Sequence, residues 1–212
     1  MLDCLTWGTA HHFGDALAGQ HRLRYRVFVQ RAGWNVPHIN EMEWDQYDTP
    51  AAHYLVWRDD NGEARGVVRF SPTNVPYMIA DIWPEMVTDV PLPRDTLTWE
   101  ATRLAVDPSA SPALRRQIRR EMVVGIMEFG LMYGVQRYIH LMPPTFVRSF
   151  LLGNGMNTWA VGPTRRIDGV PCAVWLTEVS AERLETVRKV TGVRQPVLRL
   201  ADDDGMAPAV AA

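Results

Sequence analysis

The sequence has few cysteines and no long apolar run. Only Cys4 and Cys172 occur among its 212 residues, so a framework of several disulfides is excluded. No apolar run approaches the roughly 18–20 residues of a membrane-spanning helix. The first residues do not combine a basic segment with an apolar block, as a signal peptide does. These absences predict a protein of the cytoplasm.

Charge of one sign and metal-binding patterns are also missing. The formal net charge is -2 at pH 7, so no overall basic field attracts nucleic acid. The six histidines show no metal-ligand spacing, and we expect no metal site. Neither nucleic acid nor a membrane is therefore expected as a partner.

The composition that remains is that of one globular domain. Hydrophobic residues make up 47% of the chain and charged residues 22%, as in proteins with a sizeable core. Because there is no internal repeat and no central linker, we expect a single domain over residues 1–200. Residues 201–212 are expected to form a flexible tail.

Hydrophobic periodicity in the first third of the chain predicts a helix, a loop and a hairpin. Apolar residues at helical spacing predict a helix over residues 13–31. Residues 34–50 show little periodicity and are expected to form a long ordered loop. Residues 53–57 and 65–70 are strand-like, and the Asn61-Gly62 pair between them is a strong hairpin signal.

A third strand is predicted over residues 97–106. Strict alternation would place Trp99 and Arg103 on one face of this strand, and Glu100 and Leu104 on the other.

The remaining elements are predicted from helix signals and buried apolar runs. Ser111 can cap a helix over residues 111–133, and Pro112 suits its first position. Further strands and helices are predicted, in order, over residues 136–141 (strand), 143–153 (helix), 172–179 (strand) and 181–190 (helix). The series predicts an α/β protein, a three-layer α/β/α sandwich on a mixed, mostly antiparallel sheet.

Charged side chains occur inside several segments that are patterned for burial. They are the acids and bases Asp45, Asp48, Glu100, Arg24, Arg69 and Arg103. A buried charge is costly unless it is paired or used, so the set predicts one shared polar site. Two structural alternatives stay open. Arg24 could simply pair with Asp48, and Glu100 with Arg103.

The order and spacing of these residues carry a resemblance to a known family. The pattern Arg24-x-x-x-Phe28, Trp34, Asp45-x-x-Asp48, Arg69, Glu100-x-x-Arg103 resembles that of the acyl-homoserine lactone synthases, which are bacterial autoinducer synthases. The match covers roughly the N-terminal half. Two positions depart from it, because Trp83 stands where the family often has Phe, and Leu104 where an aromatic residue commonly follows the arginine.

The resemblance implies a GNAT-like acyltransferase fold and a defined reaction. Family members transfer an acyl group from acyl-CoA or an acyl carrier protein to the amine of S-adenosylmethionine. Lactonisation then releases N-acyl-homoserine lactone and methylthioadenosine. S-adenosylmethionine is a substrate here, so no permanently bound cofactor is expected, and the carrier protein would be a transient partner.

Roles for individual residues follow from this implied chemistry. Glu100 is the candidate general base for the attacking amine, and Arg103 and Asp48 are the other expected catalytic residues. Arginines suit the substrate carboxylate, whereas carboxylates and aromatic faces suit its amine and sulfonium. The expected substrate-binding residues are Arg24, Phe28, Trp34, Asp45, Arg69, Trp83, Thr102, Leu104, Met142 and Phe146. Leu141, Phe150, Trp99 and Met127 are further candidates for the acyl pocket.

A basic face is predicted on the helix over residues 111–133. Its members Arg115, Arg116, Arg119 and Arg120 lie away from the apolar stripe and suit an acidic carrier protein or the phosphates of coenzyme A. A solvated helix face is the plain alternative.

Three other functions compete with the synthase hypothesis. A GNAT-like N-acyltransferase with a different amine acceptor usually has a glycine-rich loop before its central helix, whereas residues 106–112 contain no glycine. A methyltransferase is disfavoured because no G-x-G-x-x-G loop follows an early strand. A non-catalytic ligand-binding relative would be expected to lack Glu100 or the arginines, and this chain has both.

Overall fold

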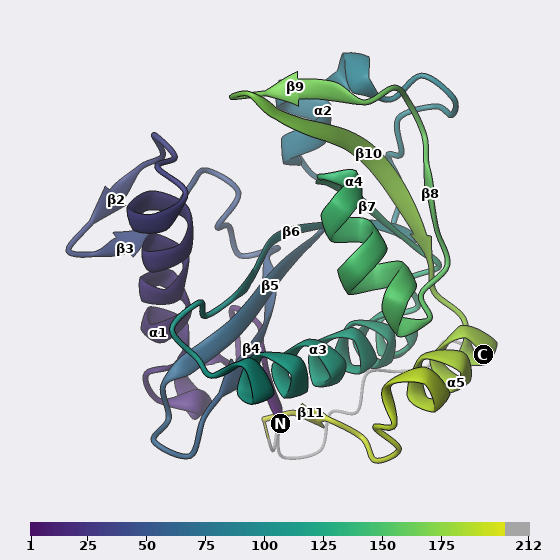
Figure 1. Cartoon of the computed structure of the whole chain (residues 1–212). Helices are drawn as coiled ribbons and strands as arrows, with labels where there is room; N and C mark the ends of the chain where they lie inside the picture. The colour runs from purple at the N-terminus through teal and green to yellow at the C-terminus, as the bar shows by residue number, and fades with distance from the viewer. Residues whose placement is uncertain (202–212) are drawn as a thin grey trace.

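The computed structural model describes residues 1–201, and a single large sheet runs through it (Figure 1). The sheet has nine strands in the order β11-β1-β4-β5-β6-β7-β10-β8, with β9 paired to β10. Its strands are β1 (Leu2–Leu5), β4 (His53–Arg58), β5 (Ala64–Pro72), β6 (Thr98–Val106), β7 (Arg137–Met142), β8 (Thr158–Ala160), β9 (Arg165–Ile167), β10 (Val170–Glu178) and β11 (Leu198–Arg199). The β1–β11 and β6–β7 pairs are parallel and the others antiparallel, which confirms the predicted mixed sheet.

Helices cover both faces of this sheet and complete three layers. The helical segments are η1 (Ala10–Phe13), α1 (Ala16–Arg24), η2 (Tyr25–Arg31), α2 (Met78–Ile82), η3 (Pro84–Met86), α3 (Pro112–Met132), α4 (Pro144–Phe146), η4 (Val147–Leu151), η5 (Leu152–Asn154) and α5 (Ala181–Thr191). The main core lies under α3, η4 and α5. Smaller cores lie on the opposite face, under α1 and α2. No helix within residues 1–201 has the length and apolar character needed to cross a membrane.

The longest helix, α3, forms as its sequence predicts. The Ser111 side chain accepts a hydrogen bond from the backbone N–H of Leu114, and Pro112 occupies the first turn. Ile118, Met122 and other apolar residues on one side of the helix are fully buried against the sheet. The antiparallel β4–β5 hairpin is likewise confirmed.

Two expectations for the first 50 residues need correction. The predicted helix over residues 13–31 is divided, because α1 passes directly into the wider π-helical turn η2. The predicted loop over residues 34–50 contains a small hairpin of β2 (His38–Ile39) and β3 (Met42–Glu43). Its turn residues, Asn40 and Glu41, have φ values of 49° and 59°, which suit a tight two-residue hairpin turn.

The predicted uninterrupted alternation along β6 is wrong, because the strand contains a bulge at Arg103. Arg103 has a φ of 53°, and the register with β5 shifts by one residue at this point. The shift moves Leu104 to the core under α3, on the side of Trp99. Ala105 then packs on the α1 side. The bulge therefore redirects the Arg103 side chain.

The parallel β6–β7 pair is short, and this opens the sheet. The two strands pair only between Thr98–Glu100 and Arg137–Ile139, after which β7 continues beside β10 up to Met142. Past Glu100, the β6 backbone has no strand partner on that side within residues 1–201. Residues of both strands beyond this point line a cavity.

Candidate active site

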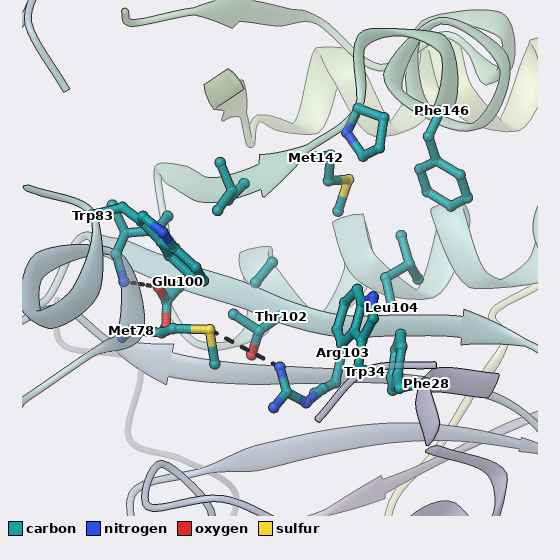
Figure 2. A pocket seen from close by; sticks show the side chains of 14 residues that line it. Phe28, Trp34, Met78, Trp83, Glu100, Thr102, Arg103, Leu104, Met142 and Phe146 are labelled. Carbon is teal, nitrogen blue, oxygen red and sulfur yellow. Dashed lines mark hydrogen bonds between the residues drawn. The ribbon is translucent and has the colours of Figure 1, made fainter. Parts of the chain in front are cut away.

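The cavity lies where β6 and β7 diverge and has a volume of about 230 Å³ (Figure 2). Elements from distant parts of the sequence form its walls. The lining residues are Phe28, Trp34, Met78, Ile79, Trp83, Glu100, Ala101, Thr102, Arg103, Leu104, Leu141, Met142, Pro143 and Phe146. The lining thus includes nine of the predicted substrate-binding or catalytic residues, Arg103 among them, together with Leu141 from the acyl-pocket candidates, and it joins the two halves of the chain.

Glu100 is the buried acid of this cavity. Its side chain is 1% exposed, and its two oxygens accept hydrogen bonds from the backbone N–H groups of Met78 (3.0 Å) and Ile79 (2.8 Å). Burial raises the pKa of Glu100 to about 7, although the two N–H groups and Arg69 act to lower it. A carboxylate with such a pKa is suited to accept a proton near neutral pH.

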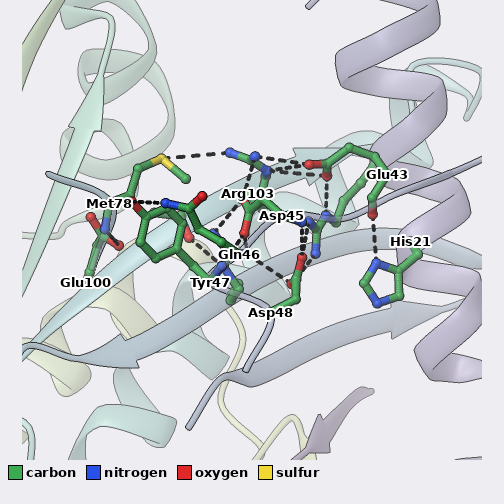
Figure 3. A network of polar contacts seen from close by, with 12 residues as sticks. His21, Glu43, Asp45, Gln46, Tyr47, Asp48, Met78, Glu100 and Arg103 are labelled. Atoms are coloured by element: carbon green, nitrogen blue, oxygen red, sulfur yellow. Dashed lines mark hydrogen bonds and ion pairs between the residues drawn. The ribbon is translucent and has the colours of Figure 1, made fainter. Parts of the chain in front are cut away.

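A network of three guanidinium groups and three carboxylates lies beside Glu100 (Figure 3). Arg24 binds Asp48 through two hydrogen bonds of 2.7 and 2.8 Å, and Arg69 binds Asp45 through two of 2.6 and 3.1 Å. The alternative in which Arg24 pairs with Asp48 is therefore confirmed as a contact. Such paired, two-point contacts offset part of the cost of burying the charges.

The third carboxylate is Glu43, which the sequence analysis missed. It is fully buried and accepts hydrogen bonds from both Arg24 and Arg103. It comes from β3, inside the segment that was expected to be a loop. The only sequence signal was its place two residues before Asp45, since alternate residues of an extended segment point to the same side.

The bulge at Arg103 explains how this arginine reaches the network. Its Nη2 donates to Asp45 at 2.6 Å and to Glu43 at 3.0 Å. The alternative in which Glu100 pairs with Arg103 is not observed among residues 1–201, where Arg103 pairs with Glu43 and Asp45 and Glu100 lies outside the network of three acids. The left-handed backbone of a non-glycine residue stores strain, which is characteristic of functional sites.

Arg103 also faces the cavity. Its guanidinium lies over the rings of Phe28 and Trp34, at 5.7 and 5.9 Å from their centroids, and these two rings stack at 4.7 Å. Its Nη1 has one described contact, a weak one with the sulfur of Met78 at 4.0 Å. One edge of the guanidinium is thus held by carboxylates while the other faces the cavity.

The network residues other than Arg103 do not line the cavity. Arg24, Arg69, Asp45 and Asp48 were expected to touch the substrate, but they do not belong to the cavity lining. Burial acts to raise the pKa of Asp48, yet its hydrogen bonds with Arg24 hold that pKa well below its usual range. Asp48 therefore stays ionised and is a poor proton acceptor. Of these four residues Asp45 contacts Arg103 directly, whereas the other three are connected to Arg103 through Glu43 and Asp45.

The apolar residues that were predicted to bind substrate or to form the acyl pocket fall into two groups, one that lines the cavity and one that does not. Trp83, Leu104, Leu141, Met142 and Phe146 line the cavity. Trp99, Met127 and Phe150, which were also considered for the acyl pocket, belong to the buried core instead and do not line it.

The four arginines of the predicted basic face lie on α3, but they differ in their exposure to solvent. Arg116, Arg119 and Arg120 are exposed. Arg115 is half-buried and donates to the backbone carbonyls of Pro108 and Ala110, at 2.8 and 2.6 Å. Arg115 therefore braces the turn before α3.

Comparisons with known proteins agree with this geometry. The family model described as autoinducer synthase matches residues 12–188. The acyl-homoserine-lactone synthase of Acinetobacter nosocomialis is 30% identical over 181 residues, which cover 81% of this chain and 97% of that protein. Two solved structures are also similar. One is TofI in a ternary complex with an inhibitor and MTA (28% identity, TM-score 0.70, covering 84% of this chain and 90% of that one).

The other is BjaI, a CoA-dependent acyl-homoserine lactone synthase, with SAM and isopentyl-CoA. It is 21% identical and has a TM-score of 0.84, and the match covers 94% of this chain and 92% of that one. At this identity, the likeness supports the fold alone. The predicted α/β architecture is confirmed by the sheet and by these neighbours.

Proposed function

The chain belongs to the autoinducer synthase family and is an acyl-homoserine-lactone synthase, and we propose that it performs this reaction in the cavity between β6 and β7. S-adenosylmethionine and an acyl thioester are its substrates. The observation that carries the proposal is the pairing, in one cavity, of a buried acid and an anchored arginine. Glu100 has a pKa of about 7, and Arg103 has one edge free for a ligand.

Arg103 binds the carboxylate of S-adenosylmethionine in this proposal. A guanidinium that is fixed on one edge by Glu43 and Asp45 presents its remaining N–H groups in a defined direction. The stacked rings of Phe28 and Trp34 beside it offer apolar and π surface to the sulfonium and the adenosine. Arg24, Arg69, Asp45 and Asp48 are positioning residues.

Glu100 accepts a proton from the substrate amine, directly or through water, in the acylation step. The amine nitrogen attacks the thioester carbonyl carbon, the C–S bond breaks, and the thiol leaves with a proton. The oxyanion that forms needs hydrogen-bond donors. We assign these donors to the β6 backbone past Glu100, because its N–H groups on the β7 side have no strand partner among residues 1–201.

Lactonisation then needs proximity more than a further base. The carboxylate oxygen attacks the γ-carbon, and the bond from that carbon to the sulfonium sulfur breaks, releasing neutral methylthioadenosine. Holding the carboxylate on Arg103 limits its freedom, which favours an intramolecular attack.

The donor is an acyl thioester of coenzyme A or of an acyl carrier protein, and we propose that the basic face of α3 receives its acidic part. Arg116, Arg119 and Arg120 are exposed and adjacent at helical spacing, as docking of an acidic carrier requires. The reaction is expected in the cytoplasm, where both substrates are made.

Mass spectrometry of extracts from an expressing host tests the proposed function. We expect an N-acyl-homoserine lactone, and the purified protein should release methylthioadenosine only when S-adenosylmethionine and a thioester are both present. A folded protein that makes no lactone in hosts with varied acyl pools would favour an N-acyltransferase with a different acceptor.

A further inference from the structure

The wall of the cavity that faces Arg103 and Thr102 is entirely apolar. Among the described lining residues, charged and hydroxyl-bearing side chains come only from β6, namely Glu100, Thr102 and Arg103. Opposite them lie Met142 and Phe146, with Leu141 and Pro143 in the same segment (Figure 2). An acyl group extending from a thioester at β6 would enter this region.

Local contacts hold this apolar wall in place. The indole N–H of Trp175 donates to the backbone carbonyl of Met142 at 3.1 Å, which fixes the end of β7. Pro143 and Pro144 follow directly, and proline restricts its own backbone and that of the preceding residue. The Phe146 ring stacks at 5.1 Å on Phe150, which is 1% exposed. The wall therefore has little freedom to move aside.

Trp83 lines another side of the cavity, and its backbone is also held in place by local contacts. Its backbone N–H donates to the carbonyl of Ile79 at 3.0 Å, and Pro84 follows it. Trp83 thus stands at the end of α2, whose first N–H groups are held by Glu100.

The space within these walls is small, and buried residues close it off behind. A cavity of roughly 150 Å³ holds one benzene molecule, and here about 230 Å³ must take the acyl group and part of the second substrate. Trp99 and Tyr138, next to the cavity on β6 and β7, are 7% and 1% exposed and belong to the packed core. Trp99 and Tyr138 themselves do not belong to the cavity lining.

We infer that the enzyme selects compact hydrocarbon acyl groups without polar substituents, and that Trp83 and Met142 set the limit. The inference rests on the proposed function and names its acyl substrate class. By the comparison with benzene, the limit is about six carbons, in a straight, branched or aromatic group. An oxo or hydroxy substituent is disfavoured because the apolar wall would leave it without a hydrogen-bond partner.

Competition between acyl donors of different length tests this inference. Purified enzyme is given S-adenosylmethionine and butanoyl, hexanoyl, octanoyl or decanoyl thioesters, with 3-oxohexanoyl as the polar probe. Each acyl group is supplied on coenzyme A and on a carrier protein, so that donor type does not obscure length. We expect kcat/KM for hexanoyl to exceed that for decanoyl and for 3-oxohexanoyl by at least about tenfold, since one methylene or one unpaired polar group is worth this much.

Substitutions in the wall should move the limit. Trp83→Ala and Met142→Ala are expected to raise the octanoyl-to-butanoyl ratio of kcat/KM by at least about tenfold. Trp159→Ala is the matched control, because Trp159 is 40% exposed on β8 and lies outside the lining. Trp83→Phe keeps the apolar contact if the alanine variant does not fold, and it should shift the ratio in the same direction by less.

The outcomes separate this inference from the proposed function. Lactone formation with equal or greater use of decanoyl by the unmodified enzyme would overturn the size limit and leave the function intact. An unchanged length ratio in folded Trp83→Phe and Met142→Ala variants would overturn the assignment of the limiting residues. Absence of lactone with every donor would contradict the proposed function itself.

Discussion

Glu100 accepts a hydrogen bond of 2.8 Å from the backbone N–H of Ile79, so the buried acid of the cavity also holds the start of α2. Its second oxygen does the same for Met78. Ile79, Met78 and Trp83 all line the cavity. The protonation state of Glu100 is therefore coupled to the position of one cavity wall, because a protonated oxygen would meet an N–H donor.

Activity should rise with pH through the pKa of Glu100. The carboxylate is the form that accepts a proton, so kcat/KM is expected to increase as pH rises through about 7. Glu100→Gln should lower turnover by at least about tenfold, since a positioned base contributes 10²–10⁴. Rates measured from pH 5.5 to 9 check both points. If the fall in kcat/KM at low pH persists unchanged in Glu100→Gln, the group that titrates is another one, such as the substrate amine.

The same group gives a stability change of opposite sign. Because the folded-state pKa of Glu100 is raised from 4.5 to about 7, its favourable contribution is complete below 4.5 and is lost as pH rises through 7. The unfolding free energy of the native enzyme should fall relative to Glu100→Gln over this window. Urea titrations at pH 5 and 8 measure the difference, and a native enzyme that gains relative stability at pH 8 would contradict it.

Sequence reasoning predicted those parts of the molecule that local rules determine. The cap and proline of α3, and the Asn61-Gly62 hairpin, act through neighbouring residues and were recognised. The bulge at Arg103 was not, because a non-glycine residue at φ 53° is selected by tertiary contacts with Glu43 and Asp45. The charged residues were expected to share one site, yet their pairing depends on a hairpin that no periodic pattern announces.

Glu43 should be important for stability despite its place in a short hairpin. It is fully buried between Arg24 and Arg103, so Glu43→Gln would leave buried positive charge without compensation. We expect the free energy of unfolding to fall by about 3–5 kcal/mol. Asp15→Asn is the matched control, since the Asp15–Arg22 pair is exposed and should contribute less than about 1 kcal/mol. Equal effects in urea unfolding would mean that Asp45 and Asp48 suffice to neutralise the arginines.

Arg103→Lys should separate binding of the two substrates. Lysine keeps the positive charge but lacks the planar guanidinium. Only a guanidinium can bind Glu43 and Asp45 along one edge and a ligand along the other. The KM for S-adenosylmethionine should rise by roughly 10–100-fold, as loss of a charge-assisted hydrogen bond predicts, with a smaller change for the acyl donor. Arg183→Lys, at a half-exposed ion pair away from the cavity, is the control. A similar rise for both substrates would indicate a general disturbance of the cavity.

Charge reversal on α3 should affect the acyl donor alone. Arg116 and Arg120 are exposed on consecutive turns, whereas S-adenosylmethionine is assigned to the cavity at Arg103. The double variant Arg116→Glu, Arg120→Glu is expected to lower kcat/KM for a carrier-protein donor by at least about tenfold, and the loss should shrink as salt screens the interaction. The matched control reverses Arg165 and Arg166, which are exposed together on β9. Equal losses in both variants would reveal a response to net charge alone, and an equal loss of S-adenosylmethionine affinity would exclude α3 as the donor-docking surface.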